Sequence, residues 1–461
     1  MNLSECLSTA DISTLRKITD HYGLSCSKHS KLSLLQELLY TFRSASFLDP
    51  AIARWQAGRD EAMIRLCLET RNRFSAEELR GIFQSCGGES VIQAAMEEGW
   101  LFPSTRYHGR LFYYIPEEIH AAMRRHLVAR FLQNLATDRE GPLLYQDEGF
   151  ALVRDLDVFL EYVRHHTVPL TTGGSMYKRN LTQVLELLEI REEPLQGGWR
   201  FGYGRRFHDY PDRLALLYDY AYSAKLVIEG EDGYLHAAED LEDWYGLTEL
   251  ERARSLMRFY INLYRRPIAR LPQVVHLIGH AAMDWLQCDQ TLAALADLVT
   301  PYYYDDRAQV WRVRILKMLM HLGLIRIGQD DAGSEWFQIT KLGQQLITPD
   351  ALPATPDQTR ERQRILIVQP NFDIVVTGDQ PMVTAELAAF TDLRQAGAIR
   401  IYRLTEASAR RGLASGGRVS AWLAFLNQHA QTPVPGNVER TLLEWGRAQD
   451  QPMAGGTSLT S

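Results

Sequence analysis

The chain has 461 residues, of which 46% are hydrophobic and 23% are charged, as in ordinary soluble globular proteins. At ~100–200 residues per domain, this length predicts three or four domains. The formal net charge of -7 argues against a general polyanion binder, so we expect any nucleic-acid site to be a local basic patch.

The cysteines and the N-terminus predict a cytoplasmic protein. Five cysteines are scattered without a C-x-x-C pair, which argues against a disulfide framework and a structural zinc site: Cys6, Cys26, Cys67, Cys86 and Cys288. The start of the chain lacks the basic and apolar regions of a signal peptide. No apolar run approaches the ~18 residues that a membrane span requires.

Residues 1–50 are expected to form a helical segment. Apolar stripes predict two helices, the first with Leu15, Ile18 and Tyr22 and the second with Leu32, Leu35, Leu38 and Leu39. Gly23 closes the first helix. The pattern resembles the SAP-type helix–loop–helix, a small DNA-binding module, which would place Lys28 and Lys31 near a phosphate. Plain helical packing explains the same residues.

Three later stretches share one plan of helices followed by two short strands, which is typical of a winged helix. They cover residues 51–145, 146–248 and 249–349. In the first, Ser75 and Glu78 have the spacing of a capping box. In the second, Glu231-Asp232-Gly233 predicts a hairpin turn. In the third, a helix ends at Gly323, and strand 324–327 follows. Because winged helices also bind proteins, this repetition predicts the fold better than the function.

Nucleotide-hydrolysing and metal-binding signatures are absent from the sequence. No G-x-x-x-x-G-K-[ST] loop, helicase motor motif, H-E-x-x-H or G-x-S-x-G occurs. The adjacent His165 and His166 do not share a helix face, so a solvated helix end is favoured over a metal site. We therefore expect no catalytic residue, no metal and no cofactor.

Residues 350–362 are rich in Pro, Thr and charge and predict a linker, and residues 448–461 predict a disordered tail. Between them, two β-branched runs flank Gln-Pro-Asn-Phe-Asp. A hairpin explains this stretch, and Asp373 is then a turn residue rather than a catalytic acid. A helix over 385–393, a strand in "AIRIYRLT" and three short helices are expected to follow, the first capped by Thr405 and Ser408.

Residues 363–447 resemble the N-terminal, damage-recognition-like domain of XPB-type DNA repair helicases. The pattern "Y-x-L-T-x-x-S-x-x-x-G", a helix and "P-x-P-x-x-V" carries the resemblance. The matching residues are Tyr402, Leu404, Thr405, Ser408, Gly412, Trp422, Leu426, Pro433, Pro435 and Val438. The upstream stretch also looks like the winged-helix arrays of bacterial helicase-associated proteins that carry this domain without a motor. In the helicases the ATPase follows this domain, and here the sequence ends, so we expect no helicase activity in this chain.

Four basic clusters are candidates for nucleic-acid binding beyond Lys28 and Lys31. "GWRFGYGRRFH" combines Arg200, Arg205 and Arg206 with aromatic residues that stack on bases. Lys178 and Arg179 begin a predicted helix whose core face carries Tyr177, Leu181, Val184, Leu185 and Leu188. Arg312 and Arg314 lie on an apolar helix, and Arg410, Arg411 and Arg418 lie in the terminal domain. The alternative interpretation for each cluster is that its aromatic side chains pack inside the protein and its charges only solubilise the surface.

The sequence thus predicts an α+β, predominantly helical protein with tandem winged helices followed by a small α+β domain similar to the XPB N-terminal domain. The leading hypothesis is a non-catalytic, DNA-binding accessory subunit that acts on duplex or junction DNA with a separately encoded XPB-like helicase in DNA repair or processing. The alternatives are a protein-binding winged-helix scaffold and a DNA-binding transcription regulator. Neither a membrane nor a small-molecule substrate is expected.

Overall fold

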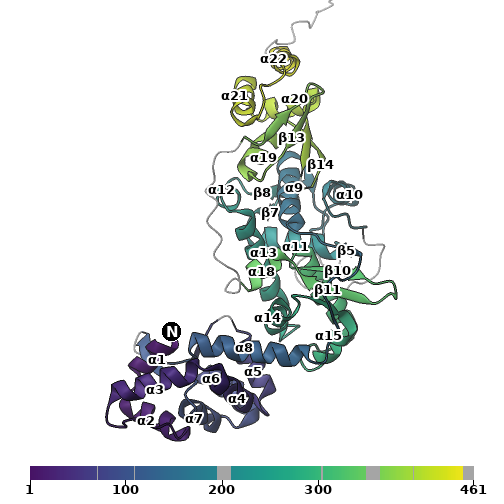
Figure 1. The fold of residues 1–461 in the computed structure, drawn as a ribbon. Helices are drawn as coiled ribbons and strands as arrows, with labels where there is room; N and C mark the ends of the chain where they lie inside the picture. The colour runs from purple at the N-terminus through teal and green to yellow at the C-terminus, as the bar shows by residue number, and fades with distance from the viewer. Residues whose placement is uncertain are drawn as a thin grey trace, which may run out of the picture. The chain divides into compact units, whose positions relative to one another are not determined.

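The computed structural model describes residues 1–69, 71–107, 110–194, 209–302, 305–348, 364–397 and 399–449. These residues are mostly helical with several small antiparallel sheets, which confirms an α+β, predominantly helical fold (Figure 1). They divide into two compact units. Unit 1 contains residues 1–144, 268–300 and 328–339, and unit 2 contains residues 145–267, 301–327 and the remainder from Thr340 onward. Within the described part of the chain, no helix is long and apolar enough to cross a membrane.

Unit 1 begins with five helices: α1 (Leu3–Thr9), α2 (Ile12–His21), α3 (Lys31–Arg43), α4 (Ala45–Gln56) and α5 (Asp60–Cys67). Gly23 follows α2 with a φ of 62°, as the predicted helix end requires. The predicted stripe of α3 is wrong in register, because Leu32 is 65% exposed whereas Leu34 and Leu38 are buried. Leu35 and Leu39 lie at the edges of the buried face.

A three-stranded sheet follows in unit 1. Its strands are β1 (Arg73–Ser75), β2 (Phe102–Tyr107) and β3 (Arg110–Tyr114), in the order β1-β3-β2. Between β1 and β2 lie α6 (Ala76–Phe83), the 3-10 helix η1 (Gln84–Cys86) and α7 (Glu89–Glu97). The predicted capping box of α6 is confirmed, because Ser75 Oγ accepts a hydrogen bond from Glu78 N at 3.2 Å and Glu78 accepts one from Ser75 N at 2.7 Å.

The rest of unit 1 comes from separated parts of the chain. It contains α8 (Glu117–Leu132), β4 (Thr137–Asp138), α14 (Leu271–Ala281), β9 (Trp285–Gln287), α15 (Cys288–Ala294) and β11 (Glu335–Ile339). Strand β9 pairs with both β4 and β11 in antiparallel register. Long-range pairing of this kind is not visible in local sequence patterns.

Unit 2 contains a second three-stranded sheet, ordered β6-β8-β7, with β6 (Val168–Pro169), β7 (Val227–Glu229) and β8 (Tyr234–Ala237). The predicted turn joins β7 to β8, with Gly233 at a φ of 80°. Its helices are α9 (Ala151–His165), α10 (Lys178–Leu187), α11 (Asp212–Ser223), α12 (Glu242–Tyr245) and α13 (Glu249–Tyr264). Then follow α16 (Arg307–Gln309), the π-helix η2 (Val310–Leu316), α17 (Lys317–His321) and α18 (Lys341–Ile347). Two further strands are β5 (Leu144–Gln146) and β10 (Ile325–Gln329).

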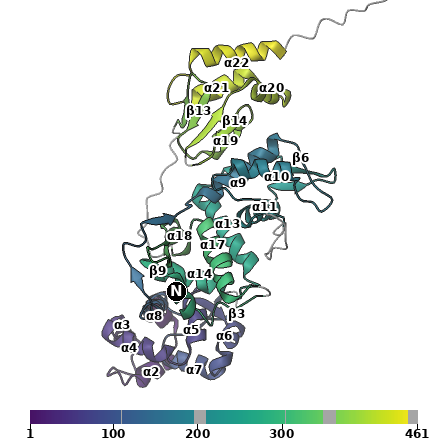
Figure 2. The ribbon, with the colours of Figure 1, turned by 90° about the vertical axis from the view of Figure 1, so that its right-hand side faces the viewer.

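The C-terminal domain of unit 2 is a four-stranded antiparallel sheet with four helices (Figure 2). The order is β12-β13-β15-β14, from β12 (Leu366–Val368), β13 (Asp373–Val376), β14 (Asp392–Gln395) and β15 (Arg400–Arg403). The helices are α19 (Pro381–Ala388), α20 (Glu406–Ala414), α21 (Val419–His429) and α22 (Gly436–Gln449), and α22 packs against both α20 and α21.

The predicted hairpin is confirmed as β12–β13, and Asp373 is the first residue of β13 after the turn. Gln369 N donates to Asp373 O at 2.8 Å, and Asp373 N donates to the Asn371 side chain at 3.1 Å. Phe372 in this turn has a positive φ of 70°. The predicted helix over 385–393 is displaced, since α19 ends at Ala388 and the unpredicted strand β14 begins at Asp392.

Most of the residues that carry the resemblance in the C-terminal domain are buried in it. Tyr402, Leu426 and Val438 are fully buried, and the Trp422 ring stacks on Phe390 with centroids 4.8 Å apart. A Cβ on Gly412 would lie 2.8 Å from Trp422, so glycine is required for this close packing. The resemblance therefore concerns packing and fold, and it identifies no chemical group.

Candidate nucleic-acid interface

The start of α10 presents two adjacent cations. Lys178 and Arg179 are both exposed, and neither has an ion-pair partner among the residues that the structure describes. On the opposite face Leu181, Val184 and Leu185 are buried, as predicted, whereas Tyr177 is 51% exposed and was wrongly assigned to the core. Helix N-termini and cations both favour phosphate, so this end of α10 is suited to contact a nucleic-acid backbone.

The basic and aromatic loop with Arg200, Arg205 and Arg206 lies outside the described residues, but both of its flanks are anchored. Before the loop, the Glu192 carboxylate accepts hydrogen bonds from Arg213 N at 3.2 Å and Leu214 N at 3.0 Å, and so caps α11. After the loop, Tyr210 Oη accepts a hydrogen bond from Met176 N at 2.8 Å. Glu192 therefore lies at the start of α11, and Tyr210 lies close to the start of α10.

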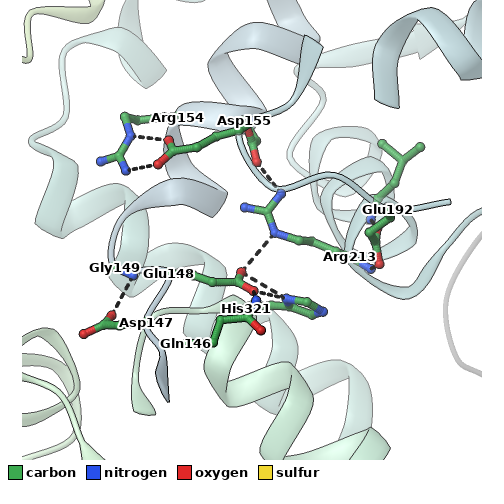
Figure 3. Close-up of polar contacts among 11 residues, drawn as sticks. Gln146, Asp147, Glu148, Gly149, Arg154, Asp155, Glu192, Arg213 and His321 are labelled. Atoms are coloured by element: carbon green, nitrogen blue, oxygen red, sulfur yellow. Dashed lines mark hydrogen bonds and ion pairs between the residues drawn. The ribbon is translucent and has the colours of Figure 1, made fainter. Parts of the chain in front are cut away.

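A buried ionic network holds these anchors in place (Figure 3). The fully buried Arg213 side chain donates to Asp155, and its Nε lies 3.3 Å from Glu148 Oε2. His321 Nδ1 lies 3.0 Å from both Glu148 carboxylate oxygens. One carboxylate oxygen of Asp155 also accepts a hydrogen bond from Glu189 N at 2.6 Å. Residues from α9, α11 and α17 thus converge on a single charge cluster.

The two carboxylates of the network have opposite pKa shifts. Burial raises the pKa of Glu148, but hydrogen bonds and charges from His321 and Arg213 outweigh burial and leave that pKa lowered. For Asp155, burial dominates over the Arg213 charge, so its pKa is raised. Removing the arginine would therefore leave a carboxylate that already resists ionisation.

The other predicted basic residues are distributed among several environments. Lys28 pairs with Asp20, and Lys31 Nζ donates to Ser8 O at 2.9 Å. Arg312 is exposed on η2. Arg314 is only 7% exposed and lies 2.8 Å from Asp305 and 3.6 Å from Asp212, so its charge is compensated inside the protein.

The three arginines of the C-terminal domain also differ from one another. Arg410 is exposed and pairs with Glu406 one turn earlier on α20. Arg411 donates to Asp392 at 2.8 Å and to Thr391 O at 3.0 Å. Arg418 is exposed at the start of α21 without an ion-pair partner in the described part of the domain. Among the described residues, Arg418 is thus the one of the three arginines without an ion-pair partner.

Sequence reasoning missed a cavity of about 120 Å³ where the C-terminal domain contacts α9. Glu161, His165 and Tyr402 line it, and Tyr402 Oη donates to Glu161 Oε2 at 3.0 Å. The prediction of a solvated helix end holds for His166 but not for His165, which is partly buried. Among the described residues, no three His, Cys, Asp or Glu side chains form a group able to hold a metal ion. A buried glutamate on the apolar face of α9 was the available sequence signal.

Ion pairs strengthen the same contact between the C-terminal domain and α9. Arg252, fully buried on α13, donates to Asp157 at 2.6 Å and to Asp379 at 3.1 Å. Arg400 approaches the same Asp379 at 3.8 Å. The C-terminal domain is thus joined to the helices of unit 2 by charges as well as by apolar packing.

The C-terminal domain is also the part of the chain with a recognisable relationship to known proteins. Residues 366–451 match the family described as helicase conserved C-terminal domain. No curated protein matches the chain. The chain therefore carries a helicase-type C-terminal domain, and this relationship covers a minority of its length.

Proposed function

We propose that the protein is a non-catalytic accessory subunit that binds DNA and acts with a separately encoded XPB-like helicase in DNA repair or processing. The match of residues 366–451 to a helicase C-terminal domain is the observation that carries the proposal. The ATPase would then lie in the partner. The basic start of α10 and the exposed Arg418 supply cations for phosphate contacts.

The sheets support a tandem winged-helix interpretation. Unit 1 contains a helix, a strand, two helices and two strands in succession, namely α5, β1, α6, α7, β2 and β3. In its sheet the third of these strands lies between the first and the second. In unit 2 the series α9, β6, α10, α11, β7, β8 repeats both the succession and the sheet order. A third stretch has the same succession along the chain, from α14 to β11. Winged helices are common in proteins that act on DNA.

In the first two of these stretches, the helices in the usual recognition position are unsuited to the major groove. Helix α7 contains no lysine or arginine and begins and ends with glutamate. In α11 the only basic residue is Arg213, which is fully buried. We therefore assign DNA contact to Lys178, Arg179 and the loop with Arg205 and Arg206, which implies phosphate binding rather than reading of base edges.

The same observation favours a second candidate, a protein-binding scaffold without direct DNA contact. Acidic or buried recognition helices and a net charge of -7 are compatible with winged helices that dock on proteins. In that case the C-terminal domain would still contact a helicase-related partner.

Fluorescence anisotropy with single-stranded, duplex and forked DNA across a salt series distinguishes the two candidates. A double variant, Lys178→Glu with Arg179→Glu, should weaken binding and reduce the slope of log K against log salt by about 2, because each phosphate contact contributes about 0.9. Lys341→Glu is the matched control, since Lys341 is an exposed cation at the first position of α18. Absence of binding to every DNA form at physiological salt would refute direct DNA recognition and leave the scaffold.

A further inference from the structure

Three buried polar atoms without a hydrogen-bond partner belong to residues that line the cavity between α9 and the C-terminal domain. They are Glu161 Oε1, His165 Nε2 and Arg411 Nε, and all three residues line the cavity. Buried polar atoms in folded proteins are normally hydrogen-bonded, so three without a partner around one cavity favour an occupant that supplies hydrogen bonds. Glu161 is only 7% exposed, whereas His166 at the rim is exposed, so the cavity reaches from solvent into the interior.

The charges around the cavity balance, which favours an uncharged occupant. Arg411 is paired with Asp392, which also lines the cavity. Burial raises the pKa of Glu161 to about 8 and lowers that of His165 to about 4, so both are neutral at pH 7. An ion entering this site would meet no net opposite charge.

The volume restricts the occupant to a small molecule or a single ring. About 120 Å³ is close to the ~150 Å³ cavity that accepts benzene and well below the ~300 Å³ of typical ligand pockets. This volume favours an occupant with one six-membered ring over one with two fused rings. Tyr162 and His166, stacked with centroids 4.4 Å apart, add an aromatic wall.

We propose that this cavity binds one uncharged pyrimidine ring through its amide edge. Arg411 Nε–H would donate to a ring carbonyl oxygen, and Glu161 and His165 would exchange hydrogen bonds with the neighbouring polar atoms of the same edge. Such a ring is presented by an unstacked base of DNA or by a free nucleoside. The assignment to DNA rests on the proposed function, and unpaired bases are the easiest to extrude from a duplex.

Saturation-transfer NMR on the full chain with thymidine tests the site, with inosine as the two-ring comparison. We expect thymidine to bind and inosine not to bind. His165→Leu removes one polar atom and Ala388→Leu fills the cavity, and each should weaken binding about tenfold or more. His280→Leu is the matched control, because His280 is also partly buried in the last turn of a helix and burial lowers its pKa to about 4 as well.

Anisotropy with duplex DNA carrying one bulged thymine distinguishes the two sources of the ring. Preference for the bulge over a fully paired duplex, lost in His165→Leu and Ala388→Leu, assigns the site to an unstacked DNA base. Thymidine binding without DNA binding assigns it to a free nucleoside and refutes the DNA role while the site stands. DNA binding with neither thymidine binding nor bulge preference overturns the site, which would then hold only water, and leaves the proposed function intact.

Discussion

Replacing Arg213 by methionine should destabilise the buried ionic network that joins α9, α11 and α17. The substitution keeps an apolar stem of similar length but leaves Asp155 without its buried charge partner and Glu148 with His321 and the Gln146 amide. Breaking a buried ion pair by removing one partner costs about 3–5 kcal/mol, because the remaining carboxylate must either stay charged without a partner or be neutralised by a proton. Burial already raises the pKa of Asp155 in the presence of the arginine, so in the variant we expect this carboxyl to be protonated on folding.

Native-state hydrogen exchange, read by mass spectrometry on peptides from α9 and α11, measures this loss locally. The free energy of opening should fall by about 3–5 kcal/mol at pH 7. The loss should shrink as pH falls, because the proton that Asp155 takes up on folding in the variant is then easier to supply. Arg410→Met is the matched control, since the exposed pair with Glu406 is worth less than about 1 kcal/mol. Equal protection of α9 and α11 in wild type and Arg213→Met would refute the reasoning.

Three further predictions concern other parts of the fold. Glu161→Gln should flatten the pH dependence of stability, because burial raises the pKa of Glu161 in the folded protein to about 8. In the wild type the protonated carboxyl contributes its full stability below the usual pKa of 4.5, and this contribution is lost as pH rises toward 8. Thermal unfolding from pH 5 to 8 measures the difference, and an equal loss of stability in both proteins would contradict the prediction. Gly323→Ala should destabilise unit 2 by more than about 1 kcal/mol, because the φ of Gly323 is 70° and the added Cβ would lie 1.9 Å from Gly149 O. Gly333→Ala is the control, since Gly333 has a similar φ but an added Cβ there would overlap no backbone atom. An unchanged melting temperature of Gly323→Ala would argue against the steric explanation. Ser75→Ala should cost about 1 kcal/mol through the lost cap of α6, seen as faster exchange of its first-turn amides, whereas Ser75→Thr should preserve protection.

Local patterns in the sequence determined much of the secondary structure. The capping residues Ser75 and Thr405, the turn glycine Gly233 and the hairpin before Asp373 all depend on hydrogen bonds within a few residues. Such interactions leave a signal in neighbouring positions, so they can be predicted without the fold. Part of the core of the C-terminal domain could also be predicted from local spacing, since Trp422 and Leu426 recur at helical spacing and are both buried.

Only the tertiary structure decided which polar groups are buried together. The partners in the Arg213 network are 58 and 65 residues apart in the chain, and Glu161 meets Tyr402 across 241 residues. Strand β14 was missed because its pairing with β15 depends on packing against neighbours rather than on its own composition. The burial of Arg314 could not be predicted for the same reason. In the sequence it is one of several cations on a helix, and its buried pairing with Asp305 and Asp212 depends on how distant segments pack.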